Sequence, residues 1–157
     1  MNGLARNASG ARSLNHAGYD TGRFVFIRVD SRLEVCMAAS PGFQKLVADA
    51  KKNITEISPE DAAQKLQIAE AAIVDVREKE DWDEGHIPNA IHLSRGTIEL
   101  DIEEKFPDKN ALIICHCGGG SRSALAAESL QKMGYANVRS MAGGLRAWKA
   151  AGLPVTK

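Results

Sequence analysis

Residues 111–134 read ALIICHCGGGSRSALAAESLQKMG, and this stretch decides the fold class. Ala111 to His116 is a short, nearly continuous apolar run, which is typical of a buried strand. Gly118 to Gly120 interrupt it, and a helix is predicted from Ser121 to the terminating Gly134. A buried strand that leads through a glycine turn into a helix is the building unit of a parallel α/β sheet.

The same alternation of short strands and helices continues on both sides of this stretch. Further strands are predicted at 54–57, 71–76, 91–93 and 137–141, and further helices at 43–50, from Ser58, at 78–84, after Gly96 and from Gly144. We therefore expect one α/β domain over residues 41–157, with a central parallel sheet of about five strands and helices on both faces.

Residues 1–40 lack this pattern and are predicted to be an N-terminal extension, disordered or non-native. A cloning-derived leader, or reading frame upstream of a natural start at Met37, fits their scattered Gly, Asn, Ser and Arg. The arginines that precede the first acidic residue, Asp20, leave a mitochondrial presequence as the alternative.

Composition excludes several classes of function. The 20 basic and 20 acidic side chains cancel, so no basic surface for nucleic acid or for an anionic membrane is expected. No apolar run approaches the roughly 20 residues of a membrane helix. The three cysteines, Cys36, Cys115 and Cys117, are too few and odd in number for a disulfide framework. They favour a reducing compartment, the cytoplasm.

The loop from Cys117 to Arg122 carries the candidate chemistry. It lies between a strand and a helix, at the carboxyl edge where open parallel sheets bind ligands. The glycines Gly118, Gly119 and Gly120 permit positive φ, so successive amide N–H groups can converge on one point as an anion nest. Ser121 is expected to cap the helix or to lend its hydroxyl, and Arg122 to supply a bidentate cation. A thiol in this field ionises readily, which makes Cys117 the candidate nucleophile.

Cys115 lies within the apolar strand and is interpreted as a core thiol. The cluster Cys115-His116-Cys117 suggests a metal site only weakly, because no second ligand pair stands at a suitable spacing. We therefore predict no metal and no cofactor.

Four segments resemble the rhodanese domain family over about Ile54 to Pro154. They are Val74-Asp75-Val76-Arg77-Glu78, Gly85-His86-Ile87-Pro88-Asn89-Ala90-Ile91, the loop Cys117 to Ser123, and Gly143-Gly144-Leu145 with Trp148. They stand in the family's order and spacing, although Asn89 occupies a place where glycine is commoner.

The resemblance implies a sulfurtransferase that carries sulfur as a persulfide on Cys117, cradled by the amides of Gly118 to Arg122. The donor would be thiosulfate, a persulfide or a polysulfide, and the acceptor cyanide, a thiol or a sulfur-accepting protein. Asp75 and Arg77 are expected to form a structural ion pair, and His86 to brace a turn. The loop lacks the basic residue that family members active toward thiosulfate often carry between cysteine and arginine, which favours a persulfide or polysulfide donor.

Two other classes of function remain open. Phosphatases and arsenate reductases also join a cysteine and an arginine around an anion, but their loops hold five intervening residues and this one holds four. The second alternative is a binding or sensing module without catalysis.

Overall fold

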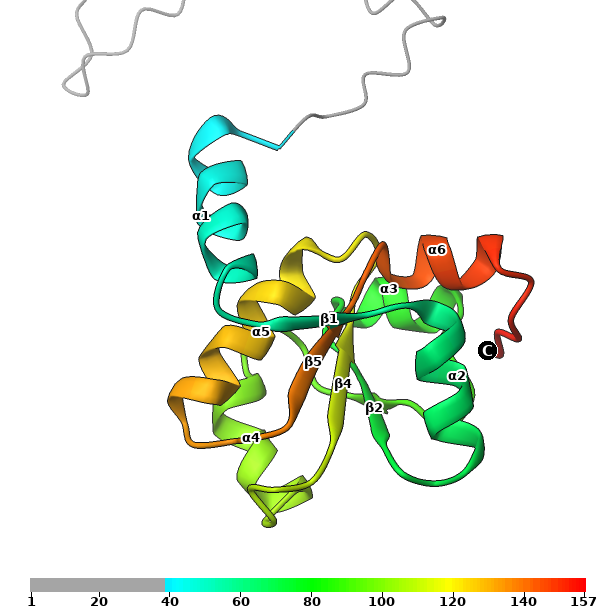
Figure 1. Ribbon diagram of the computed structural model, residues 1–157. Coiled ribbons are helices and arrows are strands. Elements are labelled where there is room, and N and C mark those ends of the chain that lie inside the picture. Colours follow the sequence, from blue (N-terminus) through cyan, green and yellow to red (C-terminus); the bar gives the residue numbers. More distant parts are fainter. Residues whose placement is uncertain (1–38) are drawn as a thin grey trace, which may run out of the picture. The chain divides into compact units, whose positions relative to one another are not determined.

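A five-stranded sheet forms the centre of the fold in the computed structural model, which describes residues 39–157 (Figure 1). Its strand order is β1-β5-β4-β2-β3, and every neighbouring pair is parallel. The strands are β1 (Thr55–Ile57), β2 (Ala72–Asp75), β3 (Ile91–His92), β4 (Ile113–His116) and β5 (Val138–Met141). The helices are α1 (Pro41–Lys51), α2 (Pro59–Gln67), α3 (Lys79–Glu84), α4 (Ile98–Lys105), α5 (Ser121–Lys132) and α6 (Gly144–Ala150).

This architecture confirms the predicted α/β fold class. The element bounds lie within a few residues of the predicted ones. The predicted extension over residues 1–40 lies outside the described residues, apart from Ala39 and Ser40.

Local sequence explains where the helices begin. The Ser58 hydroxyl accepts a hydrogen bond from the Asp61 N–H at 3.1 Å, and Pro59 occupies the first helical position of α2. Ser40 caps α1 in the same way, through the Phe43 N–H at 3.4 Å. Each serine satisfies a backbone donor that lacks a partner within its own helix.

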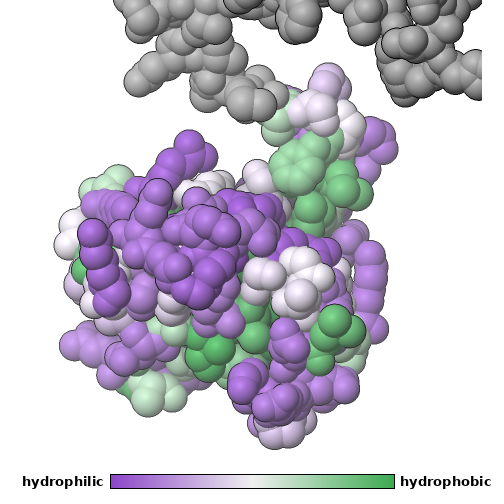
Figure 2. Space-filling model, turned by 180° about the vertical axis from the view of Figure 1, so that it is seen from behind, coloured by the Kyte–Doolittle hydropathy of each residue, from purple (hydrophilic) through white to green (hydrophobic). Residues whose placement is uncertain are grey.

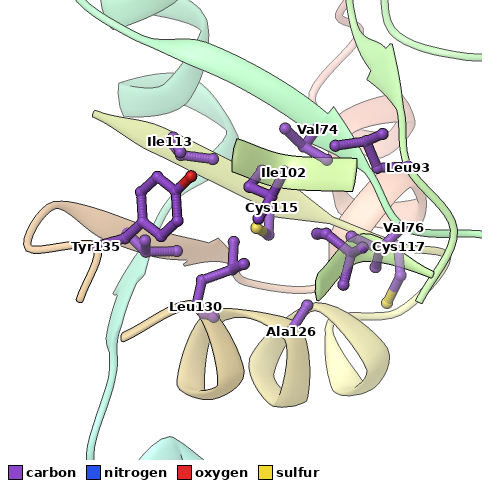
Figure 3. Close-up of a cluster of buried hydrophobic side chains, with 13 residues drawn as sticks. Val74, Val76, Leu93, Ile102, Ile113, Cys115, Cys117, Ala126, Leu130 and Tyr135 are labelled. Atoms are coloured by element: carbon purple, nitrogen blue, oxygen red, sulfur yellow. The ribbon is translucent and has the colours of Figure 1, made fainter. Parts of the chain in front are cut away.

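Side chains of β4 alternate between two apolar clusters, one on each face of the sheet. Ile113 and Cys115 pack against α4 and α5, together with Leu130 (Figure 3). Ile114 packs on the other face, against α2 and α6, with Trp148. A strand buried on both faces needs the continuous apolar run that the sequence shows.

The backbone explains the asparagine at position 89. Asn89 has φ of 62°, in the left-handed region. Glycine adopts this conformation freely and asparagine tolerates it better than most residues do. The substitution of the family's commoner glycine is therefore compatible with the same turn.

The surface is mostly hydrophilic when seen from behind, with hydrophobic side chains on α1 (Figure 2). Leu46 of α1 is 54% exposed, whereas Val47 and Ala50 are buried. No helix within residues 39–157 is long and apolar enough to span a bilayer.

Candidate active site

Cys117 lies directly after β4, the central strand, at the carboxyl edge of the sheet. Its side chain ends the row of buried residues that contains Cys115, and it lies beside Val76 (Figure 3). Only 2% of the residue is exposed. The Cys117 side chain is therefore buried rather than lying on an open surface.

The loop backbone stabilises the thiolate form of Cys117. The Gly120 N–H donates to Sγ at 3.1 Å. Burial of the sulfur opposes ionisation, but donors from the backbone of Ser123, Gly119 and Gly120 and from the Ser123 hydroxyl outweigh burial and lower the pKa of the thiol. Converging N–H groups of this kind are what an anion nest requires, and the nest itself stays a prediction.

A second serine supports the Ser123 hydroxyl. The hydroxyl oxygens of Ser123 and Ser140 lie 2.9 Å apart, and both residues are fully buried. Ser140 belongs to β5, so a neighbouring strand holds the group that reaches the sulfur.

The structure corrects the expectation that Ser121 caps the helix. This residue is the first of α5 and makes no side-chain cap; the N-cap is Gly120, with φ of 93°. The reason is geometric, because the left-handed Gly120 turns its own N–H toward Sγ. Of the three loop glycines, only Gly120 has a positive φ.

The start of α6 clamps the loop from outside. The Leu145 N–H donates to the Cys117 carbonyl at 2.7 Å, and the Arg146 N–H donates to the Gly118 carbonyl at 3.2 Å. Gly144 makes this approach possible: a Cβ atom there would lie 2.3 Å from the Cys117 carbonyl oxygen. The segment Gly143-Gly144 therefore shapes the loop that holds Cys117.

Two guanidinium groups flank the loop. Arg122 Nη2 lies 3.7 Å from the place of a Cβ on Gly118, and it donates to Asp81 at 3.1 Å. At the next residue, a Cβ on Gly119 would lie 2.3 Å from Nη2 of Arg146. Arg122 was expected to supply a bidentate cation for the anion, and this stays a prediction; in the structure its guanidinium forms an ion pair with Asp81.

Asp75 and Arg77 form a buried ion pair at the end of β2. The Asp75 carboxylate accepts from Arg77 Nε at 3.0 Å and from Nη2 at 2.7 Å, and Nη2 also donates to the Gly85 carbonyl at 2.8 Å. His116 lies next to this ion pair, with its Nε2 atom 3.5 Å from Asp75 Oδ2. Neither ring nitrogen of His116 has a hydrogen-bond partner among the described residues. Burial lowers the pKa of His116 to about 4, so the ring is neutral at pH 7.

His86 joins the turn after α3 to the C-terminal segment. Its ring stacks on Trp82 with centroids 3.6 Å apart, and its backbone pairs with Thr156. These contacts tie the turn to the C-terminal segment. Among residues 39–157 the structure records no contact between His86 and the Cys117 sulfur.

The second thiol differs sharply from the first. Cys115 is fully buried, and burial raises its pKa to about 12. Within residues 39–157 no group of three His, Cys, Asp or Glu side chains is placed to hold a metal ion.

Sequence reasoning missed three residues of this site, Ser123, Ser140 and Arg146. Ser123 belongs to the loop segment Cys117 to Ser123, so its proximity to Cys117 could have been predicted from the sequence. Arg146 follows the closing Gly-Gly segment, which the family resemblance brings to the site. Nothing in the sequence indicated a role for Ser140, because a single serine within a predicted strand belongs to no recognisable motif.

Comparison with known proteins agrees with this geometry. The family model "Rhodanese-like domain" matches residues 58–151. "Putative sulfur carrier protein YrkF" of Bacillus subtilis (strain 168) is 37% identical over 97 residues, which are 61% of this chain and 51% of that protein. The chain therefore spans about half the length of this curated relative.

Solved structures share the fold. The polysulfide-sulfur transferase homodimer of Wolinella succinogenes matches with a TM-score of 0.65 at 28% identity, over 73% of this chain and 87% of that one. A Rhodopseudomonas palustris protein of unknown function, described as a possible tyrosine phosphatase, matches with a TM-score of 0.68 at 29% identity, over 76% of this chain and 97% of that one.

Proposed function

This chain belongs to the rhodanese-like domain family, and from that premise we propose that it is a sulfurtransferase that carries sulfur as a persulfide on Cys117. One observation above all supports the proposal. The Gly120 N–H donates to Sγ of Cys117 at 3.1 Å, in a loop whose donors lower the pKa of the thiol. A thiolate held by backbone amides is a ready nucleophile at neutral pH.

In the first step the Cys117 thiolate attacks the outer sulfur of the donor. With thiosulfate, the sulfur–sulfur bond of the donor breaks and its electron pair leaves with sulfite. The product is Cys117–S–S⁻, whose outer sulfur carries the negative charge. The amides of Gly119 and Gly120, which stabilise the thiolate, are near enough to stabilise this charge as well.

In the second step an acceptor removes the outer sulfur. Cyanide attacks it and leaves as thiocyanate, or a thiolate attacks it and leaves as a new persulfide. In both cases the electron pair of the broken bond returns to Cys117, which regenerates the thiolate. The cycle is therefore ping-pong and requires no cofactor.

In this proposal a persulfide or polysulfide is a better sulfur donor than thiosulfate. The relatives include a named sulfur carrier and a named polysulfide-sulfur transferase. The loop itself contributes only one cation, Arg122, and that cation is already paired with Asp81 at 3.1 Å. A reducing compartment such as the cytoplasm completes the proposal, because it keeps Cys117 as a thiol between turnovers.

Intact-protein mass spectrometry tests the proposal. The protein is mixed with polysulfide or thiosulfate, in parallel with Cys117→Ser and with Cys115→Ser as the matched cysteine control. We expect a gain of one sulfur, about 32 Da, in wild type and in Cys115→Ser but not in Cys117→Ser. An adduct that survives in Cys117→Ser, or no adduct with either donor, would reject the proposal.

Phosphate transfer is the second candidate, because the Rhodopseudomonas palustris neighbour is described as a possible tyrosine phosphatase. Only four residues separate Cys117 and Arg122, and such a short loop encloses one sulfur atom better than a tetrahedral phosphate. The loop length therefore disfavours phosphate transfer. Hydrolysis of an aryl phosphate by wild type and not by Cys117→Ser would favour this candidate.

A further inference from the structure

Arg146 lies against the loop, and among the described residues it has no acidic partner. Its side chain is exposed, and no carboxylate among residues 39–157 forms an ion pair with it. A Cβ atom on Gly119 would lie 2.3 Å from Nη2 and 3.2 Å from Cζ of Arg146. The guanidinium therefore occupies the space into which a side chain at position 119 would extend.

The backbone fixes the base of this side chain at the same place. The Arg146 N–H donates to the Gly118 carbonyl at 3.2 Å, beside the contact between Leu145 and Cys117 at 2.7 Å. The Arg146 backbone is therefore attached to the loop. Its guanidinium lies beside Gly119, whose amide is one of the donors to Cys117.

Arg122, whose guanidinium lies near Gly118, has a different electrostatic environment. Its Nη2 donates to Asp81 at 3.1 Å, so a carboxylate partly neutralises its charge. Of the two guanidinium groups at the loop, Arg146 is the one whose charge no described carboxylate offsets. An incoming anion is therefore attracted more strongly to the Arg146 side.

We propose that Arg146 binds the anionic end of the sulfur donor and gives the site its preference for anionic donors over neutral ones. This inference rests on the proposed function, because it assumes that a donor meets Cys117 in this loop. The donor class is a small anion with a sulfane sulfur, such as thiosulfate or a polysulfide. Arg146, supplied by α6, takes the place of the basic residue that the loop lacks between Cys117 and Arg122.

Glycine at position 119 is part of the same proposed anion site. Any residue larger than glycine would meet the Arg146 guanidinium and push it from the loop. Gly119 and Arg146 are therefore complementary, because the missing side chain at position 119 leaves room for the Arg146 guanidinium beside the loop.

Two alkylating reagents of similar size test the role of charge without requiring sulfur transfer. Iodoacetate is anionic and iodoacetamide is neutral, and both label the Cys117 thiolate. Their second-order rates are measured at the Cys117 peptide, at low salt, for wild type, Arg146→Gln and Arg146→Lys. Lys149→Gln is the matched control, because it removes one exposed charge from the same helix. The rate of persulfide formation from thiosulfate is measured in parallel.

We expect Arg146→Gln to slow iodoacetate and thiosulfate about fivefold, which is the effect of a unit charge about 4 Å away in water. The iodoacetamide rate stays within about twofold, because Arg146 acts on the anion and not on the thiolate. Arg146→Lys recovers most of the lost rate, Lys149→Gln changes neither reagent, and salt erases the wild-type advantage.

Equal slowing of both reagents by Arg146→Gln would overturn the inference, because it would mean that Arg146 only braces the loop. An equal effect of Lys149→Gln would also overturn it, since any nearby charge would then suffice. If wild type forms no persulfide while Arg146→Gln still selectively slows iodoacetate, the anion site stands and the proposed sulfur transfer fails.

Discussion

The hydroxyl oxygens of Ser123 and Ser140 lie 2.9 Å apart inside the protein, and the Ser123 hydroxyl is also one of the groups that lower the pKa of Cys117. A hydroxyl has a single hydrogen to donate. When Ser123 donates it to the thiolate, the hydrogen between the two serines must come from Ser140. The strand β5 therefore positions a donor that acts on a cysteine following β4.

Replacing Ser123 with alanine is expected to raise the pKa of Cys117. A hydrogen bond to a charged group contributes about 1.5–3 kcal/mol, so the midpoint moves up by about one to two pH units. Ser140→Ala leaves the Ser123 donor in place, and the midpoint moves by less than half as much. The pH dependence of iodoacetamide labelling at Cys117 measures both. Equal midpoints in the two variants would contradict the arrangement.

The buried Cys115 thiol predicts a loss of stability in alkaline solution. Its pKa is raised from 9.0 to about 12 in the folded protein, so only the unfolded chain ionises this thiol as the pH rises above about 9. The free energy of unfolding of wild type relative to Cys115→Ala should fall by about 2–3 kcal/mol between pH 9 and pH 11. Urea unfolding at each pH provides the measurement, and a constant difference would show that burial does not hold this thiol neutral.

Gly144→Ala is expected to displace the active-site loop. Its Cβ would lie 2.3 Å from the Cys117 carbonyl oxygen and 2.9 Å from the Gly119 nitrogen, at φ of 57°. Gly152→Ala is the matched control, because its φ is 72° and no atom lies within 4 Å of the added Cβ.

Both variants should lose about 1–2 kcal/mol of stability from the left-handed backbone. Gly144→Ala should lose at least as much again from the clash, and its Cys117 labelling should slow by about tenfold or more. Thermal unfolding and labelling rates distinguish the two, and normal reactivity in Gly144→Ala would mean that α6 does not shape the loop.

The buried Asp75–Arg77 pair predicts strong coupling in stability. Asp75→Asn leaves a buried guanidinium without its counter-charge, and we expect a loss of about 3–5 kcal/mol. Arg77→Met should cost a similar amount, because it leaves the carboxylate unpaired. The double variant should cost clearly less than the sum of the two, as measured by denaturant unfolding. Additive losses would indicate that the two side chains do not act as a pair.

The order of elements could be predicted from the sequence because this fold has strong local signals. Ser58 with Pro59, the apolar run of β4 and the glycines after it each have a direct structural cause. The anion nest was predicted from the same residues. The helix begins at Ser121 as predicted, but Ser121 does not cap it, because the left-handed Gly120 occupies the N-cap position.

The partners of Cys117 from distant segments could not be predicted in this way. Ser140 and Arg146 reach the loop only because β5 lies beside β4 and α6 begins against the Cys117 carbonyl. The pairing of Arg122 with Asp81 also joins residues far apart in the chain. Contacts of this kind depend on the three-dimensional arrangement, and no spacing in the sequence encodes them.

The strand order has a consequence for synthesis on the ribosome. β5 lies between β1 and β4, and α6 follows it to clamp the carbonyl groups of Cys117 and Gly118. A nascent chain from which β5 and α6 have not yet emerged has neither a complete sheet nor the contacts that hold the loop. The surroundings of Cys117 are therefore completed only after about 30 further residues, up to the end of α6 at Ala150, have been synthesised.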